Sequence, residues 1–574
     1  MILGRYGNSP RRLGRLVSSI GALLTQRAQR WPDHPVIAFR DAQGTYAPVS
    51  WRAFLDDVAA LATFLHAQGI RKGDRAAVFS PNSYPMLLWE MAVTSMGAIS
   101  VPIFAGYDAR NVDSILGHAE PKAIYIDGDE RLAKARSSAA FGSISIIATR
   151  QPSDYAPFDD CLRGGSRELF GELVKGVRAS DVCFLQYTSG TTGAPKGVML
   201  THRNIMSQRK GMSQVWEIHP GSRFLSYLPW HHSFGGLFER FAALYHGATI
   251  FMEDSFGKDI RRLIENWGVA RPTQFFSVPK VYVALVSEAR ADPEIHKTIF
   301  HPELKFVFTA AAPLPQDCAE YFRAQDIPVV EGWGLTETSP LVTFTSFGGP
   351  RVPGCVGEPI AGCEILIDPD DEILVRGPNL MKGYFRDPER TAQVIDELGW
   401  LHTGDLGELC DAGLRMTCRK DGLFKLSNGE KVSCMLVENA VTISSQWIQF
   451  ALAVGAGEDF VGALVFPNFP NLERWAQSNG CRLPEGRALS RDRAVQELVA
   501  TEMSGSMSDF QPKYMRVKAF TIIPKELSIE DGEITPSMKV IRHHVVAKYR
   551  EWWERIYCPV QDPERQADVV TLQV

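Results

Sequence analysis

The sequence lacks the cysteine patterns that mark a disulfide framework or a structural zinc site. Its 10 cysteines are scattered along 574 residues, without a CxxC pair and without a Cys/His cluster at zinc-ligand spacing. Scattered, unpaired cysteines are typical of proteins from a reducing compartment. We therefore expect a cytoplasmic protein that needs no structural metal.

Long apolar runs and an excess of basic charge are also missing. No apolar stretch approaches the roughly 18 residues that are needed to cross a bilayer, so a membrane-spanning protein is not expected, whereas peripheral attachment to a membrane stays open. The formal net charge of -5 provides no overall positive field. Because no local basic patch is evident either, nucleic acid is not expected as a partner.

Acidic residues are absent from the first 32 positions, which contain four arginines between positions 5 and 15. This composition has features of a transit peptide. A helix over residues 13–30 is the favoured interpretation, because Leu16, Ile20 and Leu23 have helical spacing and Trp31 and Pro32 follow as a helix end.

The length predicts more than one domain, because single cores stop growing at about 250 to 300 residues. The N-terminal half alternates helix-period segments with short apolar segments, which is typical of parallel sheets covered by helices. Ser50 is placed to cap a helix whose apolar stripe begins at Phe54. The expected strands are residues 75–79, 98–104, 182–187, 247–252, 275–278 and 306–309.

A charged, glycine-containing stretch at 418–422 marks the predicted domain boundary. We expect an α/β fold, with a large N-terminal domain of α/β layers at 1–418 and a smaller α+β domain at 419–574. The smaller domain should contain a strand at 462–466 and a helix near 472–476. The polar tail from Pro559 is expected to fray.

A loop rich in glycine and hydroxyl groups follows the strand that ends at Tyr187. It reads TSGTTGAPKG from Thr188 to Gly197. Its glycines expose backbone N–H groups, its hydroxyls add donors and Lys196 adds a positive charge, a combination that suits a phosphate chain. Pro195 and Gly197 depart from the usual P-loop pattern, which disfavours a kinase or GTPase. The alternative is a flexible surface loop without a ligand.

Residues 187–204, reading YTSGTTGAPKGVMLTHRN, are similar to the signature of the adenylate-forming, or AMP-binding, superfamily. That superfamily contains acyl-CoA synthetases, luciferases and the adenylation domains of peptide synthetases. The likeness continues in order through LSYLPWHHSFGG (225–236), EGWGLTETSP (331–340), EILVRGPNLMKGYF (372–385), GWLHTGDLGEL (399–409), RKDGLFKLSNGEKV (419–432) and ITPSMKVIR (534–542). Within the superfamily, KLSNGEKV and ITPSMK resemble the long-chain fatty acyl-CoA synthetase branch.

The resemblance implies an ATP-dependent, AMP-forming acid:CoA ligase for medium- or long-chain fatty acids, which uses ATP, Mg2+ and coenzyme A. It implies that the small domain is mobile. Trp333 stands where tyrosine is commoner, Asp371 and Cys434 replace a usual glycine and proline, and Ala310 to Ala312 replace a more glycine-rich segment. These departures affect the expected shape of the pocket more than the chemistry.

The resemblance also assigns roles to residues. The catalytic residues are Lys539, Thr336, Glu337 and Lys196, with Glu337 as the ligand of a Mg2+ ion that bridges to the ATP phosphates. The nucleotide site comprises Thr188, Ser189, Gly190, Thr191, Thr192, Gly193, Lys196, Ala311, Gly332, Trp333, Gly334, Thr336, Asp405 and Arg419. In it, Trp333 stacks on adenine and Asp405 accepts hydrogen bonds from the ribose hydroxyls.

Three further sets complete the expected site. The acyl site contains Trp230, His232, Phe234 and Gly235. Asp421 is the hinge between the domains, and Lys425 and Gly429 lie on the face that meets coenzyme A. His231 and the adjacent pair at 543–544 are interpreted as structural or solvent-facing residues.

Two other functions stay open. One is an acyl-adenylate-forming enzyme that delivers the acyl group to a carrier protein or another acceptor, and the other is an inactive protein that binds acyl groups or nucleotides. Both a monomer and a homodimer are compatible with the sequence.

Overall fold

A computed structural model describes residues 5–9, 11–41, 43–151, 154–188, 196–310, 312, 314–348, 351–352, 354–442, 445–528, 531–534 and 540–574. The chain forms two compact units. The first comprises residues 1–311, 316–403 and 409–415, and the second comprises 312–315, 404–408 and 416–574. Each unit is described by itself below.

The first unit contains an eight-stranded sheet in the order β20-β10-β9-β5-β4-β6-β7-β8. The pairs from β9 through β8 are parallel, whereas β10 is antiparallel to both β9 and β20. Its strands are β4 (Arg75–Phe79), β5 (Ile99–Ile103), β6 (Ala123–Ile126), β7 (Ile146–Thr149), β8 (Ala156–Pro157), β9 (Val182–Thr188), β10 (Lys196–Thr201) and β20 (Gly383–Tyr384).

A second sheet has the order β1-β18-β19-β21-β22-β17-β16-β15-β14-β13-β11-β12-β2-β3. Neighbouring strands from β2 through β15 are parallel, which is the part expected from the alternating pattern. Its strands are β1 (Arg5–Asn8), β2 (Pro35–Arg40), β3 (Tyr46–Ser50), β11 (Arg223–Ser226), β12 (Thr249–Met252), β13 (Gln274–Ser277), β14 (Phe306–Thr309), β15 (Val329–Trp333), β16 (Thr343–Phe344), β17 (Cys355–Pro359), β18 (Glu364–Ile367), β19 (Glu372–Arg376), β21 (Leu401–Cys410) and β22 (Gly413–Arg419).

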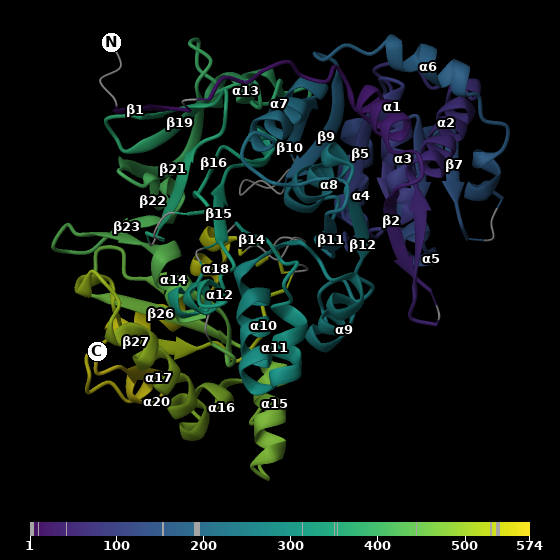
Figure 1. Ribbon diagram of the computed structural model, residues 1–574. Coiled ribbons are helices and arrows are strands. Elements are labelled where there is room, and N and C mark those ends of the chain that lie inside the picture. The colour runs from purple at the N-terminus through teal and green to yellow at the C-terminus, as the bar shows by residue number, and fades with distance from the viewer. Residues whose placement is uncertain are drawn as a thin grey trace. The chain divides into compact units, whose positions relative to one another are not determined.

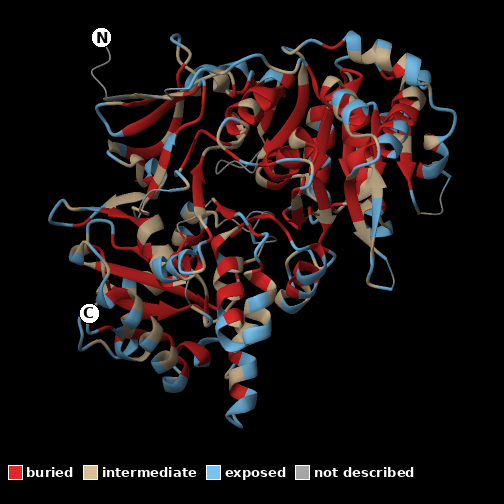
Figure 2. Ribbon diagram, viewed as in Figure 1, coloured by how far each residue is buried: buried red, intermediate tan, exposed pale blue. Residues whose placement is uncertain are grey.

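Many of the helices that pack against these sheets have a buried and an exposed side, coloured red and blue in Figure 2, whereas residues 86–95 and 240–245 are buried on all sides of their helices. The longest, α2 (Trp51–Ala67), begins after Ser50, whose hydroxyl accepts a hydrogen bond from the Ala53 N–H. The others are α1 (Ile20–Arg30), α3 (Tyr84–Ser95), α4 (Ala109–Ala119), α5 (Asp129–Arg136), α6 (Arg167–Lys175), α7 (His202–Met212), α8 (Arg240–His246), α9 (Ile260–Ala270), α10 (Pro279–Ala291), α11 (Pro293–Ile299), α12 (Gln316–Arg323) and α13 (Pro388–Val394), together with the π-helix η3 (Ser233–Glu239) (Figure 1).

The second unit is an α+β structure built on a four-stranded sheet in the order β25-β26-β27-β28. Apolar side chains cover both faces of this sheet and form two separate buried clusters. Its elements are β23 (Leu423–Lys425), β24 (Lys431–Ser433), α14 (Cys434–Thr442), β25 (Ile448–Val454), β26 (Val461–Pro467), α15 (Phe469–Ser478), α16 (Arg487–Ser490), α17 (Arg493–Ser508), β27 (Val517–Ile522), α18 (Arg542–Lys548), α19 (Arg550–Glu554), α20 (Pro563–Asp568) and β28 (Val569–Thr571). The predicted fold class is confirmed, and the mobility of the small domain and its boundary at 418/419 stay predictions.

Two local expectations were wrong. The first helix begins at Ile20 and not at residue 13, because Ser19 is its N-cap and its hydroxyl accepts a hydrogen bond from the Ala22 N–H. The tail beyond Pro559 does not fray, since α20 and β28 lie there and β28 pairs with β27. Asp568 is buried and accepts hydrogen bonds at 2.6 Å from both Arg487 and Arg491.

Candidate functional site

A sharp turn at the end of β15 presents the predicted nucleotide residues. Gly332 and Trp333 are the last residues of that strand and pair with β16, and the short helix Thr336–Thr338 follows. At Gly334 an added Cβ would lie 1.8 Å from the Pro340 carbonyl oxygen, so only glycine fits there. Trp333 is 9% exposed, which leaves little of its ring free for stacking.

Glu337 is held by a residue from another part of the chain. The Tyr384 hydroxyl donates a hydrogen bond of 2.8 Å to Glu337 Oε1, and the Met381 N–H donates one of 2.7 Å to the Glu337 carbonyl oxygen. The Lys196 ammonium lies 5.6 Å from the centre of the Tyr384 ring, within cation–π range. Tyr384 therefore connects the predicted metal ligand with the predicted phosphate-binding lysine.

The pKa of Tyr384 lies well above its usual range, because burial and then the nearby Glu337 carboxylate disfavour the phenolate. The phenol consequently stays protonated at neutral pH and acts as a hydrogen-bond donor. Tyr384 belongs to a segment that resembles the superfamily, but the sequence predicts no role for it. No local spacing signals this contact, because it depends on the pairing of β20 with β10.

Most of the predicted phosphate loop lies outside the described residues, including Ser189, Gly190, Thr191, Thr192 and Gly193. The predicted residues Ala311 and Lys539 also lie outside them. The two ends of the loop are described. Thr188 ends β9, Lys196 begins β10, and the two residues oppose each other in the antiparallel pair. The predicted loop therefore connects the adjacent ends of a strand pair in the first unit.

Thr336 contacts the segment that was predicted to bind the acyl group. Its hydroxyl oxygen lies 3.1 Å from that of Ser233, the first residue of η3. The π-helix is capped by His232, whose Nδ1 accepts a hydrogen bond of 3.3 Å from the Phe234 N–H. This contact joins the predicted nucleotide and acyl segments.

The predicted acyl residues differ in how accessible they are. Phe234 is half-buried, and its ring contacts Phe308 with centroids 5.8 Å apart, whereas Gly235 is buried within η3. Trp230 is only 1% exposed, and its indole N–H donates to the Ser226 hydroxyl at 3.2 Å. Trp230 can thus support the wall of a pocket but offers almost no surface of its own.

His231 has the structural environment that was expected for it. Its ring packs on Phe104 with centroids 4.2 Å apart. Burial, followed by repulsion from His232, holds its pKa well below the usual range, so the imidazole is neutral. His543 and His544 are exposed, and among the described residues no group of three His, Cys, Asp or Glu side chains could hold a metal.

The second unit carries its own set of predicted residues. Asp405 is buried, and its Oδ1 lies 3.4 Å from the Arg419 guanidinium, so these two predicted ribose-site residues form an ion pair. Lys425 ends β23, and Gly429 has a φ of +85° in the turn before β24. Asp421 lies in the short helix Lys420–Gly422, and its side chain is outside the described part of the structure.

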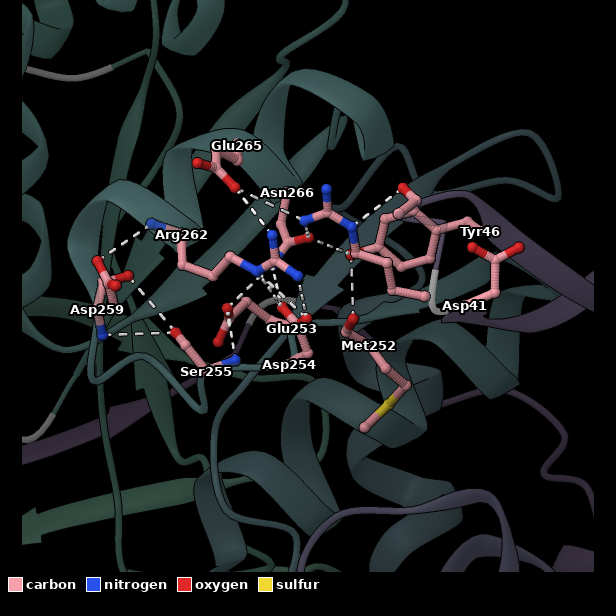
Figure 3. Close-up of polar contacts among 12 residues, drawn as sticks. Asp41, Tyr46, Met252, Glu253, Asp254, Ser255, Asp259, Arg262, Glu265 and Asn266 are labelled. Atoms are coloured by element: carbon pink, nitrogen blue, oxygen red, sulfur yellow. Dashed lines mark hydrogen bonds and ion pairs between the residues drawn. The ribbon is translucent and has the colours of Figure 1, made fainter.

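A polar cluster that contains none of the predicted residues lies where β12 ends (Figure 3). Glu253 accepts hydrogen bonds from the N–H groups of Ser255 and Gly257 and from the Asn266 amide, at 2.7 to 3.0 Å. The Tyr46 hydroxyl donates to the Met252 carbonyl oxygen at 3.0 Å. Because these groups form hydrogen bonds with one another, the polar cluster has a structural role and holds the loop after β12 against α9.

Comparisons with known proteins cover nearly the whole chain. A family model described as AMP-binding enzyme matches residues 24–385, and one described as AMP-binding enzyme C-terminal domain matches residues 421–561. Long chain acyl-CoA synthetase 7, peroxisomal, of Arabidopsis thaliana is 27% identical, over 93% of this chain and 89% of the relative. Long-chain-fatty-acid–CoA ligase FadD15 of Mycobacterium tuberculosis is 26% identical, over 94% of this chain and 97% of the relative.

Solved structures share the fold. ATP-bound MatB from Rhodopseudomonas palustris is 23% identical with a TM-score of 0.72, over 93% of this chain and 99% of that one. O-succinylbenzoate coenzyme A synthetase (MenE) from Bacillus subtilis, in complex with AMP, is 22% identical with a TM-score of 0.69, over 91% and 97%. In the part of the chain that the structure describes, no helix is long and apolar enough to span a membrane.

Proposed function

Because the chain belongs to the AMP-binding enzyme family, we propose that it is an AMP-forming acid:CoA ligase that activates medium- or long-chain fatty acids. The superfamily predicted from the signature is thereby confirmed. The observation that carries the proposed chemistry is the group formed by Glu337, Tyr384 and Lys196, because it gathers a carboxylate, a protonated phenol and an ammonium beside the predicted phosphate loop.

The proposed reaction has two steps. In the first, a carboxylate oxygen of the acid attacks the α-phosphorus of ATP, the bond to pyrophosphate breaks, and an acyl adenylate forms. In the second, the thiol sulfur of coenzyme A attacks the acyl carbon and AMP leaves. The first step joins two anions, so the protein must neutralise charge and hold both reactants in line.

Lys196 and Thr336 are proposed to supply part of that charge and orientation. Lys196 is the first residue of β10 and follows the predicted phosphate loop in sequence, and its ammonium is proposed to attract the terminal phosphates. The Thr336 hydroxyl is half-buried and adjoins Ser233, which places it between the nucleotide and acyl segments. Lys539 is proposed to act on the α-phosphate from the small domain.

Glu337 fits the role of a Mg2+ ligand. Hard cations prefer oxygen ligands and bridge to phosphate, and the Glu337 carboxylate is held by Tyr384 next to the Thr336 hydroxyl. Mg2+ bound there would neutralise negative charge on the ATP phosphates. Tyr384 would hold the carboxylate for it, and the Met381 N–H would hold the backbone of Glu337.

The proposed change between the two steps is a rotation of the small domain about Asp421. A hinge needs a residue that can absorb a large change in φ and ψ. Asp421 lies in a short helix between β22 and β23, which is a suitable place for such a change. Lys425 and Gly429 follow it and are proposed to face coenzyme A in the second step.

Two relatives that match more than nine tenths of the chain support the fatty-acid assignment, because they carry long-chain acyl-CoA synthetase or fatty-acid–CoA ligase names. The test is acid-dependent AMP formation from ATP and Mg2+, with and without coenzyme A, over straight-chain, aromatic and short acids. Repeated turnover that requires coenzyme A and is fastest with longer aliphatic acids is expected. Turnover without coenzyme A would instead indicate a carrier protein or another acceptor, and no adenylation with any acid would contradict the proposal.

A further inference from the structure

Two cysteines that are far apart in sequence lie with their sulfur atoms close together in the first unit. The Sγ atoms of Cys355 and Cys410 are 3.3 Å apart, although 55 positions separate the residues. Cys355 is the first residue of β17 and is 3% exposed, whereas Cys410 is the last residue of β21 and is half-buried. Cys410 is therefore the more exposed of the two residues.

Close backbone packing keeps these thiols together. The hairpin of β21 and β22 turns between Cys410 and Gly413, and β22 then pairs with β17. An added Cβ at Gly413 would lie 2.3 Å from the Gly357 carbonyl oxygen, so the tip of the hairpin contacts β17 without an intervening side chain. The backbone packing consequently keeps the two cysteines next to each other, while their side chains can still rotate.

We propose that Cys355 and Cys410 form an oxidation site, at which a peroxide converts the two thiols into an intramolecular disulfide. The Cys410 thiolate attacks one peroxide oxygen, the O–O bond breaks, and a sulfenic acid and water (from hydrogen peroxide) form. The Cys355 sulfur then attacks the Cys410 sulfur, the S–O bond breaks, and a second water leaves. Two thiols and one hydrogen peroxide thus yield one disulfide and two waters.

The geometry and environment agree with this order of events. A disulfide has an S–S distance of about 2.05 Å, so the sulfurs must approach each other by about 1.3 Å, which small rotations of the two side chains can supply. Burial, and then the adjacent Cys410 sulfur, raise the pKa of the Cys355 thiol, although a hydrogen bond with Arg415 acts in the opposite direction. A buried thiol with a raised pKa is a poor first target for peroxide, which leaves Cys410 as the thiol that is oxidised first.

Other cysteines provide internal controls. Cys481 is exposed, so it reports how strongly a given peroxide treatment oxidises surface thiols. Cys363 is buried, and its thiol donates to the Asn379 side-chain oxygen at 2.9 Å, so it reports the reactivity of an enclosed thiol. A disulfide specific to the proposed site must form while Cys363 stays reduced.

The experiment uses the full-length chain treated with increasing hydrogen peroxide, after which the remaining thiols are alkylated in denaturant. Digestion without reductant and mass spectrometry then identify cross-linked peptides. We expect a peptide pair that joins Cys355 to Cys410, is lighter by two hydrogens than the reduced pair, and disappears on reduction. Because the bond closes a loop between residues 55 positions apart, the oxidised protein should also unfold a few degrees higher.

Single variants separate the proposed site from general oxidation. In Cys355→Ser the cross-link should be absent and Cys410 should be oxidised beyond the sulfenic acid, whereas in Cys410→Ser the Cys355 thiol should stay reduced. Before oxidation Cys410→Ser should match the wild-type unfolding midpoint, because that residue is half-buried, whereas Cys355→Ser buries a hydroxyl and should unfold at a lower temperature. If Cys355 and Cys410 both remain alkylatable at peroxide concentrations that oxidise Cys481, or if Cys410 pairs with another cysteine, the proposal is wrong.

Discussion

The hydrogen bond from Tyr384 to Glu337 can be removed by one substitution, which tests the proposed ATP site. Tyr384→Phe removes one hydroxyl and keeps the ring, and so it removes the 2.8 Å hydrogen bond to Glu337 Oε1 without opening a cavity. The ring of Tyr384 is 5% exposed and should pack as before. The substitution therefore changes how the carboxylate is held much more than it changes the fold.

The expected magnitude follows from the charge of the acceptor. A hydrogen bond to a charged group contributes about 1.5 to 3 kcal/mol, and about 1.4 kcal/mol corresponds to a factor of ten. Tyr384→Phe should therefore lower kcat/KM for ATP by about 10- to 100-fold. If Glu337 is a Mg2+ ligand, the variant should also need more Mg2+ to reach half of its maximal rate.

The assay is acid-dependent pyrophosphate exchange at several Mg2+ concentrations, with thermal unfolding measured on the same samples. Tyr46→Phe is the matched control, because it also removes a tyrosine hydroxyl. That hydroxyl donates its hydrogen bond within the polar cluster of Figure 3 and not to a predicted site residue. A Tyr384→Phe protein that is stable and keeps kcat/KM within about twofold of the wild type would refute the reasoning, since no 1.5 kcal/mol contribution would then exist.

Three further predictions concern the small domain. Lys539→Ala should lower adenylation by about a hundredfold or more, while preformed acyl adenylate is still converted to thioester; equal loss in both half-reactions would contradict its role. Asp421→Pro should spare adenylation and block thioester formation, because proline fixes φ, and unimpaired thioester formation would remove the hinge. Burial raises the pKa of Asp568, but hydrogen bonds from Arg491 and Arg487 outweigh it and leave that pKa below the usual 3.8. The hydrogen bonds to the Asp568 carboxylate therefore stabilise the fold at neutral pH, and this stabilisation is lost as the pH falls below 3.8. Asp568→Asn should lower the free energy of unfolding by roughly 2 kcal/mol at pH 7 and by less in acid. Urea unfolding at pH 7 and in acid measures the difference.

The fold could be predicted where local chemistry determines the structure. The segment Arg75–Phe79 is a strand with the predicted bounds, and Ser50 caps α2, because apolar periodicity and an N-cap residue act within a few residues. The tail could not be predicted in this way. Its strand β28 is only three residues long and is stabilised by pairing with β27, and Asp568 is stabilised by arginines about 80 positions away.

In the candidate site, too, the residues of one local segment could be predicted, whereas their partners from distant segments could not. Trp333, Thr336 and Glu337 lie in one short segment, so a resemblance over ten residues was sufficient to propose them. The partner of Glu337 is Tyr384, which is 47 positions away, and the partner of Thr336 is Ser233, which is 103 positions away. Such partners depend on strand pairing and on the position of η3, which no local pattern in one sequence contains.

Chain-length preference also depends on contacts between residues that are far apart in sequence. Phe234 is half-buried, but behind it the rings of Phe238, Phe276 and Phe308 are almost fully buried and contact one another with centroids 4.8 to 5.4 Å apart. These rings come from η3, β13 and β14, and each is indistinguishable in sequence from an ordinary core phenylalanine. If the proposed acyl site lies at Phe234, an acyl tail directed past it would meet these packed rings, whose displacement a close-packed interior resists. Chain-length preference would then depend on the packing of residues from three separate elements, which no local pattern in one sequence contains.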